Sequence, residues 1–385
     1  MTAHRGNLPP LPRRPHARQD LARRALLRTA SLAALIPTGA ALTACSGRNH
    51  DPLASSGQNG PDNTAQGTTS DGGAAGAPLD AAAPITVGLT YIPNVQFCAF
   101  YLGVEQKLFG DLDLRLRHHG EQEGLFEALR LGREQIVYAS ADEAAVAGGV
   151  TSVATCYQTY PGEVMISGSA AGLGDLAGRS LGIPGRFGSS YYAALLALHT
   201  AGLTEQDVNL VEIGYTAVSA LATGAVDAIL GFVNNELVQL ESQQVDVTSV
   251  PIAPEQTLVG PSLVTLPEHA DDPVIATIVD GMAEAERRVI ADPDAALEAT
   301  ARQVSALADP VQMDNARAVL EATMPLWKDA GGEVSLATDD QAAQRMTTFL
   351  RKAGIVDTAA SADEHTDDDH ADGEALQKAS DSGEG

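Results

Sequence analysis

From Pro84 onward, short apolar runs alternate with stretches in which apolar residues recur every three or four positions. The runs have the length and composition of strands, and the stretches have the period of amphipathic helices. In the first half of the pattern we predict strands at 85–89, 112–119, 135–140 and 152–158, separated by helices at 95–109, 123–132 and 142–149. Strands that alternate with helices indicate βα units and a parallel sheet.

The same pattern starts again at Arg179. It predicts strands at 179–183, 208–214, 226–232, 245–250 and 262–266, with helices at 190–202, 216–224 and 234–244. After these the chain is mostly helical, with helices predicted at 272–291, 294–307, 310–322 and 338–353.

Each set is about the size of one small sheet domain, so the pattern predicts an α/β fold with two lobes and a ligand cleft between them. We assign residues 84–167 and about 255–355 to the first lobe, and residues 168–254 to the second. In open α/β sheets, ligands bind outside the carboxyl ends of the strands. The residues that follow each strand are therefore the candidate ligand contacts.

Aromatic, amide, hydroxyl and carboxylate side chains gather at these positions. The stretch YIPNVQFCAFYLG (91–103) holds four rings, in a chain with one Trp, eight Tyr and seven Phe. Rings can stack on a flat heterocycle, while amides and carboxylates can bind its edge. We expect Phe100 and Tyr101 to be core, and pure packing of all four rings is the alternative. The predicted ligand contacts are Tyr91, Asn94, Gln96, Phe97, Ser140, Asp142, Glu143, Tyr157, Tyr160, Phe187, Ser189, Ser190, Tyr191, Asn234, Asn235 and Glu236.

The loop GIPGRFGSS (182–190) precedes a predicted helix, whose first backbone N–H groups favour an anion. It matches neither of the two glycine-rich nucleotide motifs, GxxxxGK[ST] and GxGxxG. Ser189 and Ser190 at this helix start could hold a sulfonate or phosphate, with Arg186 as the nearest cation. A turn and cap of purely structural use is the alternative.

The residues before the pattern have the character of an export signal. A basic region is followed by an apolar run at 29–44 that is too short and too interrupted to span a bilayer. We predict a signal peptide at 1–44, with a twin-arginine-like motif at Arg23 and Arg24. LTAC (42–45) resembles a lipobox and predicts lipidation of Cys45; an ordinary secretory signal is the alternative. Residues 45–83, rich in small and polar residues, are predicted to be a disordered tether.

The net charge of −26 is distributed unevenly. Residues 1–44 are basic, and residues 358–385 are predicted to be a disordered acidic tail, in which His365 and His370 could bind a metal weakly. The body between them stays acidic and shows no basic stretch, which argues against nucleic acid as a partner.

Signals for catalysis or a resident cofactor are sparse. The motif HExxH is absent, and the carboxylates at Asp142, Glu143 and Glu236 do not define an acid–base pair by sequence. Cys98 and Cys156 are in no CxxC pattern, so we expect buried free thiols, although sequence leaves a disulfide open. We predict no metal, no cofactor and no enzyme activity.

Four stretches together resemble the SsuA/THI5-like (NMT1) solute-binding proteins of ABC importers. They are YIPNVQFCAFYLGVEQKLF (91–109), LDLRLRHHGEQEGLFEALRLG (112–132) followed by SADEAA, LAGRSLGIPGRFGSSYYAALL (176–196) and LATGAVDAILGFVNNE (221–236). The resemblance implies a type II periplasmic-binding-protein-like fold, delivery of a small molecule to ABC permease subunits, and a lipid anchor on the outer face of the cell membrane. We expect a monomer.

IPNVQF (92–97) together with NNE (234–236) looks most like the branch that takes riboflavin or pyrimidine precursors of thiamine. Thiamine-precursor members commonly have His where this chain has Phe97, which makes a stacking role for Phe97 possible. An alkanesulfonate-type anion is the alternative ligand. A secreted THI5-like pyrimidine synthase is a further alternative, although its Cys-rich motif and reactive His are missing.

Overall fold

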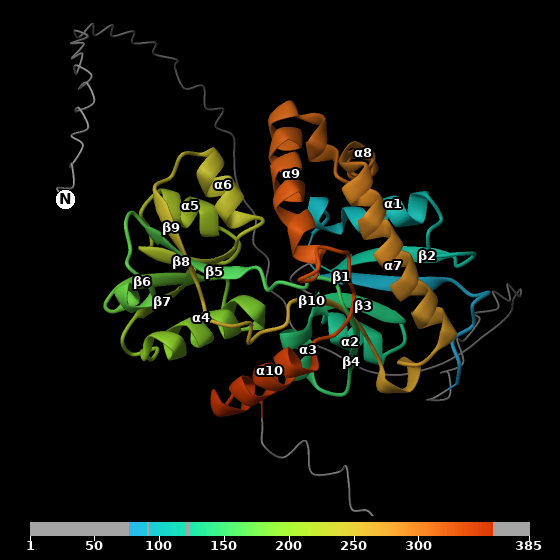
Figure 1. Ribbon diagram of the computed structural model, residues 1–385, viewed down its shortest axis with the longest axis horizontal. Coiled ribbons are helices and arrows are strands. Elements are labelled where there is room, and N and C mark those ends of the chain that lie inside the picture. Colours follow the sequence, from blue (N-terminus) through green and yellow to red (C-terminus); the bar gives the residue numbers. More distant parts are fainter. Residues whose placement is uncertain (1–76, 91, 120–123, 357–385) are drawn as a thin grey trace, which may run out of the picture. The chain divides into compact units, whose positions relative to one another are not determined.

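The computed structural model describes residues 77–90, 92–119 and 124–356 (Figure 1). The predicted signal peptide, Cys45, most of the tether, Tyr91 and the acidic tail lie outside the described residues. Within them the chain forms two five-stranded sheets, so the predicted α/β class is confirmed.

The first sheet has the strand order β2-β1-β3-β10-β4. β1 is parallel to β2 and β3, whereas β10 is antiparallel to both β3 and β4. The sheet is therefore mixed rather than purely parallel as predicted. Its strands are β1 (Ile85–Thr90), β2 (Leu114–His119), β3 (Ile136–Ser140), β4 (Thr151–Thr155) and β10 (Pro261–Thr265).

Helices cover both faces of the first sheet, as strands buried on two sides require. α1 packs against α7 and α8 over one face, and α2 and α3 contact the other (Figure 1). The two faces therefore contribute to separate apolar clusters. Leu89 and Ile136 belong to one cluster, and Val137 and Val264 belong to the other. These helices are α1 (Cys98–Glu105), α2 (Leu125–Arg130), α3 (Ala141–Ala147), α7 (Pro273–Ala291) and α8 (Pro293–Gln303).

The second sheet has the order β7-β6-β8-β5-β9. β6 is parallel to β7 and β8, and β5 is antiparallel to β8 and β9. α4 packs on one face, and α5 and α6 pack on the other. The elements are β5 (Gly162–Ser167), β6 (Ser180–Ile183), β7 (Asn209–Glu212), β8 (Ala228–Phe232), β9 (Val247–Pro251), α4 (Gly188–Ala201), α5 (Ala217–Ala222) and α6 (Glu236–Ser242).

The pattern analysis missed β5. Its sequence GEVMIS begins directly after Pro161, and a single buried run of three apolar residues gives no period to detect. β5 belongs to the second sheet, so sheet membership changes between β4 and β5, before the predicted lobe boundary at residue 168. The boundaries of the lobes themselves stay predictions.

The last helices of the chain pack into different hydrophobic cores. α9 (Pro310–Thr323) and the 3-10 turn η5 (Met324–Trp327) pack into the first core, whereas the apolar face of α10 (Asp340–Lys352) packs against α4 in the second. α10, which was predicted with the first lobe, also contacts α3 beside the first sheet, so its lobe stays a prediction. Four more 3-10 turns are η1 (Val95–Phe97), η2 (Leu173–Leu176), η3 (Pro267–His269) and η4 (Ser305–Ala308).

One helix is shorter than predicted. The stretch 95–109 divides into η1 and α1, and α1 ends at Glu105. The chain leaves the helix through Lys107, whose φ of 56° is left-handed, and the amide of Leu108 donates back to the carbonyl of Gly103. This is a Schellman-type helix end. Such ends usually have Gly at the left-handed position, so Lys107 gave no sign of one in the sequence.

Two linkers join the carboxyl edges of the two sheets. Residues 156–161 run from β4 to β5, and residues 252–260 return from β9 to β10. Pro261 pairs with Ser140 at the end of β3, and Gly162 pairs with Phe232 at the end of β8. Both linkers thus start and finish where the parallel strands of each sheet end, which is where α/β sheets place ligands.

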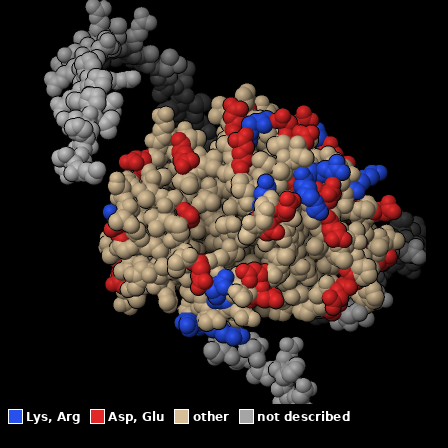
Figure 2. All heavy atoms as spheres, viewed as in Figure 1, with Lys and Arg blue, Asp and Glu red and all other residues tan. Residues whose placement is uncertain are grey.

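No helix in the described part of the chain combines the length and apolarity that a bilayer crossing demands. On the face drawn in Figure 2, Asp and Glu side chains are scattered among Lys and Arg, and no continuous basic surface appears there.

Candidate functional site

The turn after β1 is organised by Asn94. Its side-chain oxygen accepts the Gln96 amide at 2.8 Å, and its Nδ2 donates to the Ile92 carbonyl at 3.0 Å, which starts η1. Asn94 and Gln96 are both partly exposed. This polar turn at the carboxyl edge of the first sheet is therefore available to a ligand.

Phe97 lies deeper than Asn94. Its side chain is 3% exposed, and its ring packs edge-on against His118 and Tyr138, with centroid distances of 5.0 and 5.9 Å. The structure thus places Phe97 in the first core, together with Phe100 and Tyr101 as predicted. A stacking contact between Phe97 and a ligand stays a prediction.

A second group of predicted residues lies at the starts of α3 and α4, where hydrogen bonds connect the helix after β3 of the first sheet to the helix after β6 of the second. Ser189, at the start of α4, donates from its hydroxyl to Asp142 of α3 at 2.5 Å. The hydroxyl of Tyr160, in the first linker, lies 3.4 Å from the Asp142 carboxylate and 3.3 Å from the Ser189 carbonyl. We call Asp142, Glu143, Tyr160 and Ser189 the inter-sheet junction.

Glu143 completes the junction. Ser140 and Glu143 form a capping box at the start of α3, and the backbone N–H of Ser189 also donates to Glu143. Gly188 has a φ of 72°, and a Cβ there would come within 2.9 Å of the Glu143 carboxylate. A larger residue would disturb both the backbone and this contact.

Burial dominates the electrostatics of the junction. Asp142 is fully buried, and this desolvation, with the Glu143 charge, raises the pKa of Asp142 to about 8. Burial also raises the pKa of Glu143 and of the Tyr160 hydroxyl. In the described residues, no Lys, Arg or His forms an ion pair with Asp142 or Glu143.

A third group follows β8. The fully buried Asn234 donates from Nδ2 to the Thr323 hydroxyl of α9 at 2.9 Å, which links the second sheet to the first core. Its Oδ1 has no hydrogen-bond partner among the described residues. Because an unpaired buried acceptor is costly, this oxygen is a candidate for a ligand or water donor.

The side chains of Asn235 and Glu236 form hydrogen bonds within their own segment of the chain. Glu236 accepts from the Phe232 amide and from Asn235 Nδ2, each at 2.8 Å, so its carboxylate ties the end of β8 to the start of α6. Burial raises the pKa of Glu236. Both side chains remain partly exposed.

Sequence reasoning predicted Tyr157 as a ligand contact but missed the buried polar residues around it, Thr323, Tyr138 and Glu286. Thr323 is hydrogen-bonded to Tyr157, and Tyr157 to Tyr138, so a buried chain of hydroxyls runs from Asn234 into the first core. Glu286 of α7 is buried beside Tyr138 and Tyr157, and its burial raises its pKa well above the usual range. Thr323, Tyr138 and Glu286 lie within helices and strands, and only their polarity at core positions could have indicated them.

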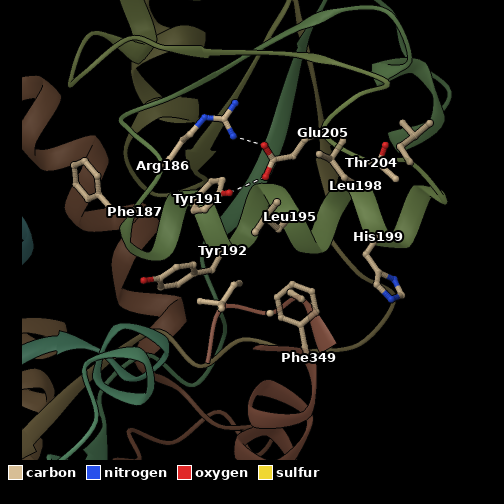
Figure 3. A pocket seen from close by; sticks show the side chains of 14 residues that line it. Arg186, Phe187, Tyr191, Tyr192, Leu195, Leu198, His199, Thr204, Glu205 and Phe349 are labelled. Carbon is tan, nitrogen blue, oxygen red and sulfur yellow. Dashed lines mark hydrogen bonds and ion pairs between the residues drawn. The ribbon is translucent and has the colours of Figure 1, made fainter. Parts of the chain in front are cut away.

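Phe187 and Tyr191, predicted as ligand contacts, line a different pocket of about 640 Å³ between α4 and α10 (Figure 3). Tyr191 donates to Glu205 at 2.7 Å, and Arg186 pairs with the same carboxylate. Phe349 of α10 also lines this pocket. The pocket is built from residues of the second sheet's helices and α10, so it does not bring the two sheets together.

Cys98 and Cys156 are both free and fully buried, as predicted. Burial, with the nearby Glu286 carboxyl, raises the pKa of both thiols. Within the described ranges, no three His, Cys, Asp or Glu side chains are placed to hold a metal ion.

Comparison with known proteins gives a family and a relative. A family model described as "NMT1/THI5 like" matches residues 94–296. The chain is 28% identical, over 308 residues, to the riboflavin-binding protein RibY of Chloroflexus aurantiacus, a match that covers 73% of this chain and 86% of RibY.

Solved structures show the same fold at low identity. The alkanesulfonate-binding protein SsuA of Xanthomonas axonopodis pv. citri, bound to MOPS, is 16% identical with a TM-score of 0.54, covering 73% of this chain and 96% of SsuA. The aliphatic sulphonate-binding protein SsuA of Escherichia coli is 15% identical with a TM-score of 0.55, covering 71% and 88%. The predicted periplasmic-binding-protein-like fold is therefore confirmed.

Proposed function

Because the chain belongs to the NMT1/THI5-like family, we propose that it is an extracytoplasmic solute-binding protein that captures a flat heteroaromatic vitamin or vitamin precursor. Riboflavin is the first candidate, and a pyrimidine precursor of thiamine is the second. The protein delivers its ligand to an ABC permease and carries out no chemistry on it.

The similarity to RibY carries this proposal. It extends over 308 residues and 86% of the relative, so it includes both sheets and both linkers rather than one motif. The described site has the parts that a flat, hydrogen-bonding ligand needs. Asn94 and Gln96 lie at the edge of the first sheet, Tyr160 lies in a linker, and Asn234 has an unpaired oxygen at the edge of the second.

The proposal extends to the ends of the chain. We propose that residues 1–44 are removed, that Cys45 carries the lipid, and that the predicted tether (45–83) links the body to the outer face of the membrane. The end of this segment belongs to the body, because Leu79 packs against the first core and its amide donates to Asp272 at 2.7 Å. A disordered segment at 45–76 would have a mean reach of roughly 30 Å. The body would then bind its ligand and meet the permease as a monomer.

The alternative ligand, an alkanesulfonate, has one structural feature in its favour. The two SsuA proteins share the fold, and α4 starts with two serines. At identities of 16% and 15%, the likeness to these proteins indicates a shared fold but does not indicate a shared ligand. Ser189 already donates to Asp142 and Glu143, which leaves fewer donors for a sulfonate.

The test is a binding panel on the purified chain with Cys45→Ser. Riboflavin, thiamine, its hydroxymethylpyrimidine precursor and two alkanesulfonates are compared by thermal shift and titration calorimetry. A ligand at 100 times its Kd should add about 2.7 kcal/mol to the free energy of unfolding. Binding of a ring compound supports the proposal. Binding of a sulfonate alone, or of nothing in the panel, would contradict it.

A further inference from the structure

The first turn of α4 is covered by carboxylates of the same chain. The N-terminus of a helix of this length normally offers free N–H groups and a positive dipole end to an anion. Here the Ser189 hydroxyl donates to Asp142 at 2.5 Å, and the Ser189 amide donates to Glu143. The carboxylate of Glu143 also lies against Gly188, so it occupies the space directly before the helix.

These carboxylates have no cationic partner to offset them. In the described part of the chain, none of the ion pairs involves Asp142, Glu143 or Glu236. Arg186, the nearest cation in the loop before α4, pairs with Glu205 and lies 3.8 Å from Glu212. Once the pH exceeds the raised pKa of Asp142, about 8, an anion approaching the junction would meet negative charge in a desolvated place, where repulsion is weakly screened.

The remaining polar groups along this edge are also acceptors. β6 and β8 are parallel neighbours, so Ser189 and Asn234 follow strands that end at the same edge of the second sheet. Asn234 uses its amide nitrogen on Thr323 and leaves its oxygen unpaired among the described residues. Glu236 presents a further partly exposed carboxylate. Such an edge suits a ligand that donates hydrogen bonds.

We infer that Asp142 and Glu143 act as a charge filter, which admits uncharged ring compounds with hydroxyl or N–H donors and rejects their phosphorylated or sulfonated relatives. This inference rests on the proposed function, because it assumes that the ligand lies at the junction. Glu143, which is partly exposed, accepts from the ligand, whereas the buried Asp142 holds Ser189 in place.

The test compares riboflavin with flavin mononucleotide, which differ by one phosphate. Fluorescence quenching at pH 9, where Asp142 is ionised, is measured on the chain with Cys45→Ser, alone and with Asp142→Asn, Glu143→Gln or both. The amides keep the shape, Asn can still accept from Ser189, and Gln can still form the capping box. Glu163→Gln is the matched control, since Glu163 accepts from the Ser249 hydroxyl at 2.5 Å elsewhere in the second sheet.

In the parent protein we expect riboflavin to bind at least about 100-fold tighter than its phosphate, and the double variant to lose at least about tenfold of that ratio through tighter binding of the phosphate. Glu163→Gln should leave the ratio unchanged. Equal affinity of the parent for both flavins, or an unchanged ratio in the double variant, would overturn the filter.

A second readout needs no vitamin. Inorganic phosphate should raise the Tm of the double variant more than that of the parent or of Glu163→Gln, because the two carboxylates no longer repel an anion at the start of α4. Equal shifts in all three proteins would overturn the filter. If no flavin or pyrimidine binds while phosphate separates the variants as expected, the proposed function fails, and only the exclusion of anions from the start of α4 stands.

Discussion

At the scale of single residues, the junction is defined by acceptors that have few donors. Asp142 and Glu143 share Ser189, and Asn234 has one unpaired oxygen among the described residues. Such groups cost stability in the ligand-free protein, because a buried charge or acceptor loses its water. A site that binds a ligand can tolerate this cost, since the ligand restores the missing bonds.

Asp142→Asn is expected to change how stability depends on pH. Burial raises the folded-state pKa of Asp142 to about 8, so the folded protein binds more protons than the unfolded chain between pH 4 and pH 8. The contribution of Asp142 is therefore most favourable at low pH and is lost as pH rises toward 8. The variant should be more stable than the parent at pH 8, by roughly 1–3 kcal/mol, and should not be so at pH 4. Urea unfolding at both values measures this, and a larger gain at pH 4 would refute it.

Thr323→Val is expected to cost about 1–3 kcal/mol of unfolding free energy. Valine keeps the shape but removes the hydroxyl that accepts from Asn234 and bonds to Tyr157, so two buried groups lose a partner. Thr347→Val is the control, because its hydroxyl bonds only to the Ala343 carbonyl one turn back, as Thr323 does to Val319. Equal costs for the two variants in urea unfolding would show that the Asn234 link contributes nothing.

At the scale of elements, the second core depends on a helix from the far end of the chain. Ala342, Met346, Phe349 and Leu350 of α10 are buried with residues of α4. Their spacing places them on one side of an amphipathic helix. The 640 Å³ pocket in Figure 3 is the part of this interface that α10 does not fill.

Phe349→Ala should therefore destabilise the protein by about 3 kcal/mol, through lost burial and a cavity beside α4. Phe349 is 7% exposed and packs edge-on to His199 at 6.4 Å between ring centroids. Thr348→Ala, an exposed change one residue earlier, should have little effect. Thermal unfolding compares the two, and similar Tm values would mean that α10 is not part of the second core.

At the scale of the whole molecule, the two sheets are connected by the linkers, the junction and the Asn234–Thr323 bond. The first core is the larger, and it holds both body cysteines in its interior. Access to these thiols therefore reports the opening of this core rather than a local movement at its surface.

In the chain with Cys45→Ser, Cys98 and Cys156 should not react with a thiol reagent in the native state, and both should react after unfolding. They are fully buried, and burial raises the pKa of both thiols, which lowers the thiolate fraction. The number of thiols that have reacted, plotted against urea concentration, should give a curve that coincides with the urea unfolding curve. Rapid reaction of either cysteine in the native protein would contradict the structure.

The sequence by itself determined the α/β class, the order of almost all helices and strands, the family and the candidate ligand contacts near each strand end. The class and the order of the elements follow from local periodicity, since neighbouring residues carry a period of two or about 3.6. The family was indicated by the four stretches that resemble it. β5 escaped because GEVMIS is too short to show a period, and α1 ends early because Lys107 takes a left-handed conformation.

Only the tertiary structure decided which of the candidate residues meet. Ser189 and Asp142 are 47 positions apart, and Asn234 and Thr323 are 89 apart, so no local pattern could pair them. It also sent Phe97 into the core, placed Phe187 and Tyr191 in the lining of the pocket beside α4, and covered the start of α4 with two carboxylates. The physical reason is that contacts between distant segments depend on how the sheets, linkers and helices pack together, and that information is spread over the whole chain.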